Sequence, residues 1–198
     1  TMMFIGGLMG CKGDAYKATE LLPASEAKSF HSWQADLFKQ AQVDFLFAGI
    51  MPALPEAIGM AQAMSETGLP YIISFMLLRN GRLIDGTSIH DAITQIDEET
   101  QTKPICYMTN CIHPAILYEA LSQPFNQTLL VRKRFLGIQA NTSPLSPEEL
   151  DGADDLQCTD PDSLAIEMIR LRDEMKLKIF GGCCGTDKSH LEEIARRL

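Results

Sequence analysis

Two adjacent cysteines, Cys183 and Cys184, stand inside the glycine-rich run Gly-Gly-Cys-Cys-Gly-Thr at residues 181–186. Adjacent cysteines do not easily form a relaxed disulfide with each other, but a tight glycine turn lets both bind one metal ion. A third cysteine, Cys111, follows the apolar run 105–108. Three thiolates and one open position are typical of a catalytic zinc site rather than a closed structural one. We therefore predict that Cys111, Cys183 and Cys184 bind Zn²⁺.

A zinc site of this kind predicts thiol chemistry. Coordination deprotonates a thiol whose pKa is about 8.5 in water, which makes it a nucleophile at neutral pH. Soft sulfur ligands donate charge to the metal and leave an added thiolate nucleophilic. The competing interpretation of Cys183 and Cys184 is a redox or merely structural pair.

The other candidate residues give weaker signals. Cys106 stands within an apolar run and is expected in the core, where cysteine is commonly found. Cys11 and Cys158 are expected not to bind the metal. His113 follows Cys111 by two positions and either lines the site or caps a helix that begins near Pro114.

Composition excludes several classes of function. The 198 residues carry 26 acidic and 17 basic side chains, a net charge of -9 that repels nucleic acid and anionic membranes. No apolar run approaches the ~20 residues that cross a bilayer, and the opening residues do not resemble a signal peptide. Six cysteines without a secretory signal favour free thiols or metal, and hence a reducing cytoplasm.

Short apolar runs alternate with segments of helical spacing along the whole chain, which predicts parallel βαβ units in one domain, residues 1–198. Helices are expected at 25–42, 54–67 with Gly68 as the terminating glycine, 88–98 capped by Ser88, 161–175, and 187–198 capped by Asp187. The expected strands are Met3–Ile5, Phe45–Ala48, Tyr71–Leu77, Ile105–Met108, Phe135–Ile138 and Lys178–Phe180.

Such repetition forms either a doubly wound sheet or a β/α barrel. No G-x-G-x-x-G motif opens a helix, so a dinucleotide-binding fold has no support. A (β/α)8 barrel of the TIM type usually needs ~250 residues, so this chain is about two βα units short of one. Both cysteine motifs follow strands, and in such a barrel the carboxyl ends of the strands hold the active site.

The cysteine motifs resemble those of the homocysteine S-methyltransferase family, a family of zinc-binding β/α barrels that includes S-methylmethionine- and betaine-dependent enzymes and the homocysteine module of methionine synthase. The resemblance covers the whole chain and makes it similar to strands three to eight, with the first two βα units lacking. It implies that the activated acceptor thiolate attacks a methyl group in line. Asn110, before Cys111, and Asn141, at the end of the seventh strand, are expected to make polar contacts with the substrate.

One departure from the family concerns the acceptor. Relatives usually end the fourth strand with Phe-Glu-Thr, and the glutamate helps to hold the amino group of homocysteine. The corresponding residues here are Ala48, Gly49 and Ile50, so the carboxylate is absent. The resemblance therefore implies methyl transfer to homocysteine or a similar small thiol, within methionine biosynthesis.

Several alternatives remain open. Either the chain is a fragment, or a partner or second copy completes its barrel, or it is a degenerate relative that binds zinc or thiols without catalysis. Besides the methyltransferase and the non-catalytic relative, a thiol redox protein is the third functional class. The expected partners are a small thiol acceptor and a small sulfonium or ammonium methyl donor, because no cobalamin- or folate-binding segment is present.

Overall fold

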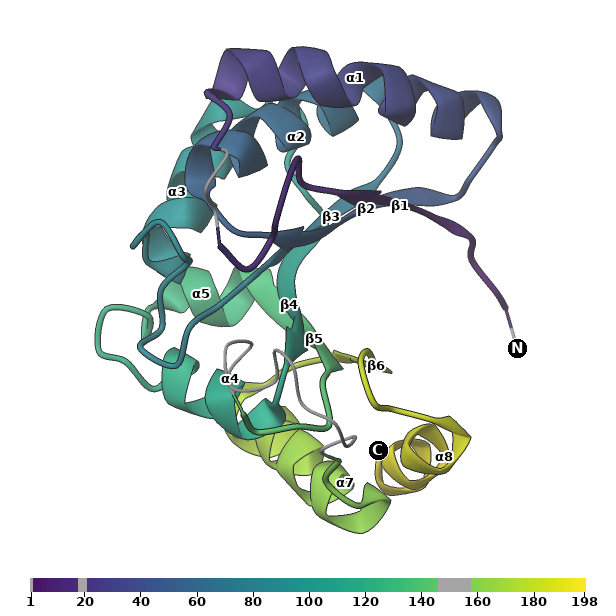
Figure 1. Cartoon of the computed structure of the whole chain (residues 1–198), viewed down its shortest axis with the longest axis vertical. Coiled ribbons are helices and arrows are strands. Elements are labelled where there is room, and N and C mark those ends of the chain that lie inside the picture. The colour runs from purple at the N-terminus through teal and green to yellow at the C-terminus, as the bar shows by residue number, and fades with distance from the viewer. Residues whose placement is uncertain (1, 18–20, 146–157) are drawn as a thin grey trace.

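A computed structural model describes residues 2–17, 21–145 and 158–198, in which six parallel strands form one sheet. The sheet curls into an open arc, with its concave face toward the gap between the first and last strands (Figure 1). The strands follow one another in chain order: β1 (Gly6–Gly10), β2 (Phe45–Met51), β3 (Tyr71–Phe75), β4 (Cys106–Ile112), β5 (Phe135–Ala140) and β6 (Ile179–Gly182). A doubly wound sheet reverses its strand order at a switch point, so this order matches a half-barrel instead.

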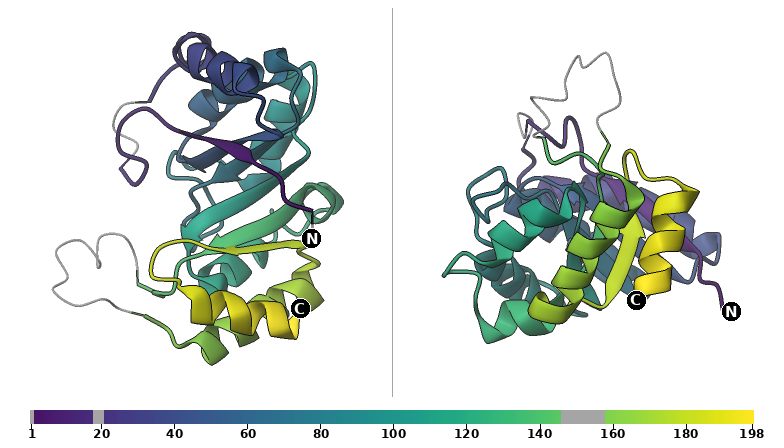
Figure 2. Two further views of the ribbon diagram at one scale, coloured as in Figure 1. Left: turned by 90° about the vertical axis from the view of Figure 1, so that its right-hand side faces the viewer. Right: turned by 90° about the horizontal axis from the view of Figure 1, so that it is seen from below.

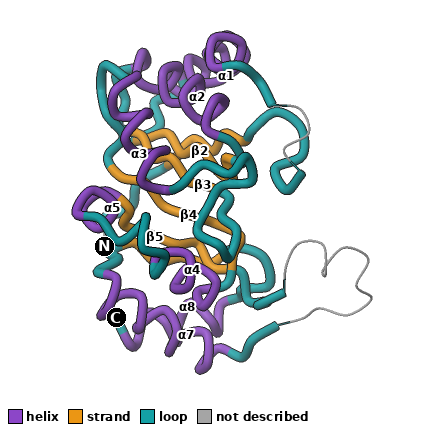
Figure 3. The backbone as a smooth tube through the Cα atoms, turned by 90° about the vertical axis from the view of Figure 1, so that its left-hand side faces the viewer, coloured by secondary structure: helices purple, strands orange, loops and turns teal. Residues whose placement is uncertain are grey.

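Helices cover the convex face of the arc, as Figures 1 and 3 show from two sides. None of the helices in the described residues is long and apolar enough to span a bilayer. The helices are α1 (Ala24–Gln40), α2 (Leu54–Thr67), α3 (Ile89–Glu99), α4 (Pro114–Leu121), α5 (Leu129–Arg134), α7 (Pro161–Arg170), which continues as the π-helical turn η1 (Leu171–Met175), and α8 (Lys188–Arg197).

The predicted helix boundaries are largely confirmed by their caps. The Ser88 hydroxyl accepts the Asp91 N–H at 3.0 Å, and Asp187 forms a capping box with His190. Gly68 ends α2 in the left-handed conformation, with φ 76°. The short helix α5 was not predicted, and the helix expected to reach Met175 changes to a π-helical turn after Arg170.

Five of the six predicted strands are confirmed, with ends shifted by a few residues, and the first is wrong. Residues 3–5 are exposed and precede the ladder, which begins where Gly6 pairs with Phe45. The observed strand, Gly6–Gly10, is rich in glycine and so lacks the apolar run on which the prediction relied. Its Gly7 is required, because a Cβ there would lie 2.6 Å from the Phe38 ring of α1.

A partly buried polar cluster lies at the amino-terminal end of the sheet, and no local pattern in the sequence predicted it. Arg134, at the end of α5, donates to both carboxylate oxygens of Asp97 on α3, at 2.9 and 3.2 Å. The Tyr107 hydroxyl of β4 donates to the same carboxylate at 2.8 Å. Burial, and next the charge of Asp97, hold the pKa of Tyr107 far above its usual value. The cluster ties two helices to the central strand.

We expect Asp97→Asn to lower the free energy of unfolding by roughly 2–3 kcal/mol, because the Arg134 charge would then stand partly buried without its partner. Urea denaturation followed by circular dichroism measures this. The matched control is Glu192→Gln, which breaks an exposed pair with Lys188 on α8 and should cost less than about 0.5 kcal/mol. Equal losses in both variants would contradict a stabilising role for the cluster.

Candidate metal centre

The sulfur atoms of Cys111, Cys183 and Cys184 form one cluster, all within 4.8 Å of one another. Cys184 Sγ lies 3.9 Å from Cys111 Sγ and 4.0 Å from Cys183 Sγ. The sulfur atoms of Cys111 and Cys183 are in direct contact, as in a disulfide, with Cα atoms 5.6 Å apart. The three residues predicted as a set are therefore brought together.

Cys111 reaches the cluster through an irregularity in β4. The sequence placed this residue in a loop after the strand, but it lies within the strand and is almost fully buried. The pairing of β4 with β5 shifts register between Asn110 and Ile112, and Cys111 takes the left-handed conformation with φ 60°. A bulge of this kind re-aims one side chain, here the Cys111 thiol.

Cys183 and Cys184 are held by a tight turn directly after β6. The Cys183 N–H donates to the Ala140 carbonyl at 2.7 Å, which fixes the turn to the end of β5. The Cys183 carbonyl accepts from both the N–H and the hydroxyl of Thr186, at 3.2 and 2.7 Å. Gly185 has φ 77°, and its Cβ position lies 2.1 Å from the Thr142 hydroxyl. The glycine frame is thus a steric requirement of the turn.

The donor set fits zinc. Tetrahedral zinc with Zn–S bonds of 2.3 Å places its sulfur ligands about 3.8 Å apart, close to the 3.9 and 4.0 Å that separate Cys184 from its two neighbours. The contact between Cys111 and Cys183 would have to open for these sulfurs to share a metal. Because Cys184 is exposed, a fourth ligand has access from solvent on this side.

The same contact corrects the redox alternative. The sequence suggested a pair formed by Cys183 and Cys184, whereas the sulfurs in bonding contact belong to Cys111 and Cys183. Oxidation and metal binding would therefore compete for the same two thiols.

The remaining cysteines are not members of the three-sulfur cluster, although the Cys158 thiol donates to the carbonyl of Gly185, next to Cys184, at 3.9 Å. Cys106 is buried in β4, and Cys11 and Cys158 are free. Burial and the charge of Glu56 raise the pKa of Cys11 to about 11, which keeps it protonated at neutral pH and unsuited to a metal.

The two asparagines predicted to contact substrate are already engaged by the protein. The Asn110 amide oxygen accepts from the Ser74 hydroxyl at 2.6 Å and from the Ile50 N–H at 3.0 Å. Asn141 lies directly after β5, and its side-chain oxygen accepts the Ser143 N–H at 2.9 Å. Both lie near the carboxyl ends of the strands, and their contact with a substrate stays a prediction.

His113 caps α4, one of its two predicted roles, and its Nδ1 accepts the Ala115 N–H at 3.2 Å. Burial, and next the charge of Arg79, lower its pKa to about 4. The ring is therefore neutral at pH 7, the form in which Nδ1 can accept. Its Nε2 lies 3.3 Å from the Thr159 hydroxyl.

Tyr16 stands in the segment that follows β1. Burial, and next the charge of Cys184, raise the pKa of its phenol.

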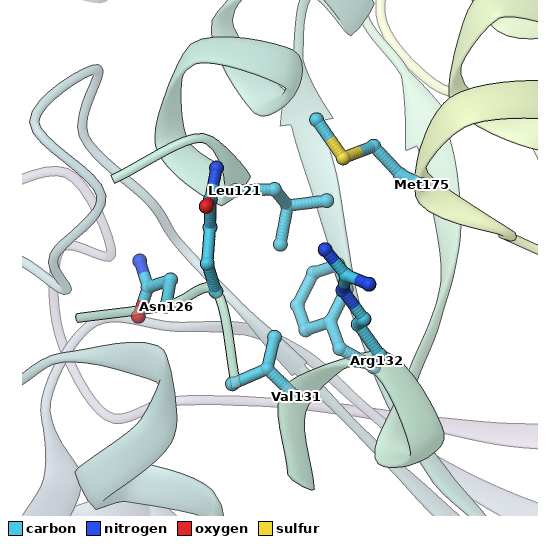
Figure 4. Close-up of a pocket in the computed structure, with 7 residues that line it drawn as sticks. Leu121, Asn126, Val131, Arg132 and Met175 are labelled. Carbon is cyan, nitrogen blue, oxygen red and sulfur yellow. The ribbon is translucent and has the colours of Figure 1, made fainter. Parts of the chain in front are cut away.

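A small cavity elsewhere is not part of this site. Its volume is about 30 Å³, enough for one or two waters, and Leu121, Asn126, Val131, Arg132 and Met175 are among its lining residues (Figure 4). Phe135, another of them, is the first residue of β5. The cavity therefore lies toward the amino-terminal end of the sheet, away from the cysteines.

Three solved structures of one bacterial enzyme resemble this fold. They are the apo, metallated and oxidized forms of the homocysteine methyltransferase MmuM from Escherichia coli. Their identities to this chain are 19, 18 and 18%, and their TM-scores are 0.74, 0.76 and 0.70. The matches cover 99, 99 and 94% of this chain but only 64, 62 and 56% of the enzyme. The chain therefore spans less than two thirds of the length of these structures.

Comparison with curated protein sequences finds no match. The family model described as homocysteine S-methyltransferase matches residues 1–198, the full length of the sequence. With the parallel half-barrel and the converging cysteines, this match settles the classification. The chain belongs to the homocysteine S-methyltransferase family.

Proposed function

We propose that this chain carries the metal centre of a zinc-dependent S-methyltransferase that methylates homocysteine or a similar small thiol. The observation that carries the proposal is the convergence of three sulfur atoms, one from β4 and two from the turn after β6. Zinc bound there would keep the acceptor thiol deprotonated at neutral pH. Thiols kept available for metal fit a reducing cytoplasm.

The transfer itself needs only an acceptor and an activated methyl donor. The acceptor thiol loses its proton, and its sulfur then forms a bond to the methyl carbon. The bond between that carbon and the donor's sulfur or nitrogen breaks, and its electron pair leaves with the donor. A small sulfonium or ammonium donor is charged before transfer and neutral afterwards, which makes it a good leaving group.

The acceptor pocket is proposed to lack the usual carboxylate. Gly49 stands at the carboxyl end of β2, and its Cβ position lies 3.1 Å from the Leu8 side chain of β1. An apolar side chain provides neither a charge nor a hydrogen-bond acceptor for an ammonium group. The acceptor's amino group is therefore expected to contribute little to binding by these residues.

The open sheet is proposed to gain further strands, from more of the same protein, a second copy or another chain. In the described residues, β1 and β6 each pair with a single neighbour. Figure 2 shows the arc from its open side, with β1 and β6 at its two margins. The Leu8 side chain on β1 is 63% exposed. Free edges and exposed apolar side chains are surfaces that a sheet protein normally covers.

Two specific observations favour other functions. The absent carboxylate at Gly49 favours a relative that binds zinc or thiols without catalysis. The contact between Cys111 and Cys183 favours a thiol redox protein. The experiments below separate these functions from methyl transfer.

Protein reduced under argon, loaded with zinc and dialysed is expected to retain one zinc per chain by elemental analysis. Cys183→Ser should weaken zinc affinity by about 100-fold or more in competition with a chromogenic chelator, because one of three thiolates is lost. Cys11→Ser is the matched control: it changes a thiol outside the cluster and should leave zinc affinity unaltered.

A zinc content far below one per chain, unaffected by Cys183→Ser, would remove the proposed metal centre. Thiol labelling distinguishes the redox alternative. Zinc-bound thiols become reactive when a chelator is added, whereas a disulfide releases its thiols only to a reductant.

The turn after β6 can be tested with two glycines of the same backbone conformation. Gly185→Ala and Gly68→Ala, at φ 77° and 76°, should share a conformational cost of about 1–2 kcal/mol. Only Gly185→Ala also meets Thr142, whose N–H donates to the Cys184 carbonyl at 3.1 Å. We expect Gly185→Ala to weaken zinc affinity about tenfold or more, and Gly68→Ala to leave it unchanged. Equal zinc affinities would show that the turn does not set the site.

Calorimetric titration of the zinc-loaded protein tests the acceptor. Homocysteine and 4-sulfanylbutanoic acid, which lacks the amino group, are expected to bind within about fivefold of each other, since Gly49 offers no carboxylate. Gly49→Glu should favour homocysteine by about tenfold, the worth of one hydrogen bond between charged groups, and Gly49→Gln is its control. Strong preference of the protein without substitutions for homocysteine would contradict a pocket that lacks a carboxylate for the amino group. Binding of neither thiol would favour the non-catalytic relative.

A further inference from the structure

We propose that Asn110 is a positioning residue of the metal centre. Its side-chain amide connects the bulge at Ile50 in β2 with the bulge at Cys111 in β4, two residues with a left-handed backbone conformation. The same amide donates an N–H···S hydrogen bond to Cys111. The inference rests on the proposed zinc function and assigns Asn110 a task different from contact with the substrate. Its support lies in the hydrogen bonds, the backbone conformations and the burial of this one side chain.

The orientation of the amide is fixed by its oxygen. Asn110 is only 5% exposed, and its Oδ1 accepts from the Ser74 hydroxyl at 2.6 Å and from the Ile50 N–H at 3.0 Å. A hydroxyl and a backbone N–H both donate here, so the acceptor end of the amide must face them. The NH₂ group therefore faces the opposite way, where Nδ2 lies 3.7 Å from Cys111 Sγ.

The two residues that this amide connects share a rare conformation. In the described residues, four non-glycine residues have positive φ, and two of them are Ile50 at 55° and Cys111 at 60°. Each stands at a register shift, between Ala48 and Met51 in β2 and between Asn110 and Ile112 in β4. Left-handed residues of this type cost of order 1–3 kcal/mol and persist only where their surroundings hold them.

The Asn110 side chain supplies such surroundings for both residues. β2 and β4 are separated by β3, and Ser74 on β3 supplies the hydroxyl between them. The Ile50 N–H that the bulge turns away from the sheet ladder is satisfied by Asn110. One side chain thus links three strands at the point where Cys111 leaves the regular ladder.

A hydrogen bond to the sulfur also bears on metal binding. An N–H donor stabilises a thiolate more than a thiol and restricts the directions in which its lone pairs are free. Residues that orient metal ligands in this way commonly change metal affinity by 10–100-fold when altered. Asn110 can act on the metal through Cys111 without touching it.

The test uses Asn110→Asp, which keeps an acceptor for Ser74 and Ile50 but replaces the NH₂ donor with an oxygen. We expect zinc affinity, measured by chelator competition, to fall 10–100-fold, and the thiolate-to-metal charge-transfer band of the cobalt-substituted protein to shift. Ser74→Ala removes one of the bonds that orient the amide and should weaken zinc binding several-fold. This milder variant decides the matter if Asn110→Asp does not fold.

Thr109→Val is the matched control. Thr109 is the preceding residue of β4, fully buried, and its hydroxyl donates to the Phe75 carbonyl at 2.8 Å. Loss of that bond should lower the melting temperature but leave zinc affinity within twofold and the cobalt spectrum unchanged. A merely structural role of Asn110 would give the same pattern as this control.

The outcomes separate the two proposals. If zinc affinity and the cobalt spectrum do not change in Asn110→Asp or in Ser74→Ala, while the protein without these substitutions binds one zinc, the positioning role of Asn110 alone is overturned. An unaltered protein that binds no zinc would overturn the proposed function, and this inference with it.

Discussion

The cysteine cluster depends on closing a distance that a regular sheet does not close. β4 and β6 are separated by β5, and strands two apart in a flat sheet lie roughly 9–10 Å from each other. The Cα atoms of Cys111 and Cys183 are nevertheless 5.6 Å apart. Three features shorten the distance: the curl of the sheet, the bulge at Cys111, and the turn that anchors Cys183 to the end of β5. Without them the Cys111 thiol of β4 would lie too far from the two thiols that follow β6 to share one metal ion with them.

The residues at the two ends of the sheet therefore have different roles: those at one end stabilise the fold, and those at the other position the thiols. At the amino-terminal end, Asp97, Arg134 and Tyr107 satisfy one another's charges and hydrogen bonds and join helices to β4. At the carboxyl end, left-handed residues and glycines with tight surroundings gather around the thiols. Regular pairing in the interior of the sheet supplies the stability that such local strain requires.

Sequence reasoning identified the parts of this structure that are encoded locally. Apolar runs marked the strands β2 to β6, and cap residues such as Ser88 and Asp187 marked helix starts. The cysteine trio was predictable because few functions other than metal binding require Gly-Gly-Cys-Cys-Gly and a third strand-end cysteine. The family itself was recognised from these motifs and confirmed by the family model over residues 1–198.

The remainder depends on contacts between distant residues. β1 was missed because it is rich in glycine, and the reason for one of these glycines, the close Phe38 ring beside Gly7, is a contact between residues distant in sequence. The bulges at Ile50 and Cys111 were missed because neither position holds the glycine that usually marks positive φ. The ion pair of Asp97 and Arg134 joins segments that no periodicity relates.

Because the strands follow chain order, the position of the cysteine cluster determines which part of the chain a bound metal would stabilise. A metal held by all three thiols would cross-link positions 72 residues apart in sequence, and so remove much of the freedom of the intervening chain when it is unfolded. That loop contains β5 and β6 together with α4, α5, α7 and η1, which the cross-link would constrain although none of them binds the ion. The strands from β1 to β3 lie outside the loop and would gain no such protection. Loss of structure would then begin at the β1 margin and stop at the metal.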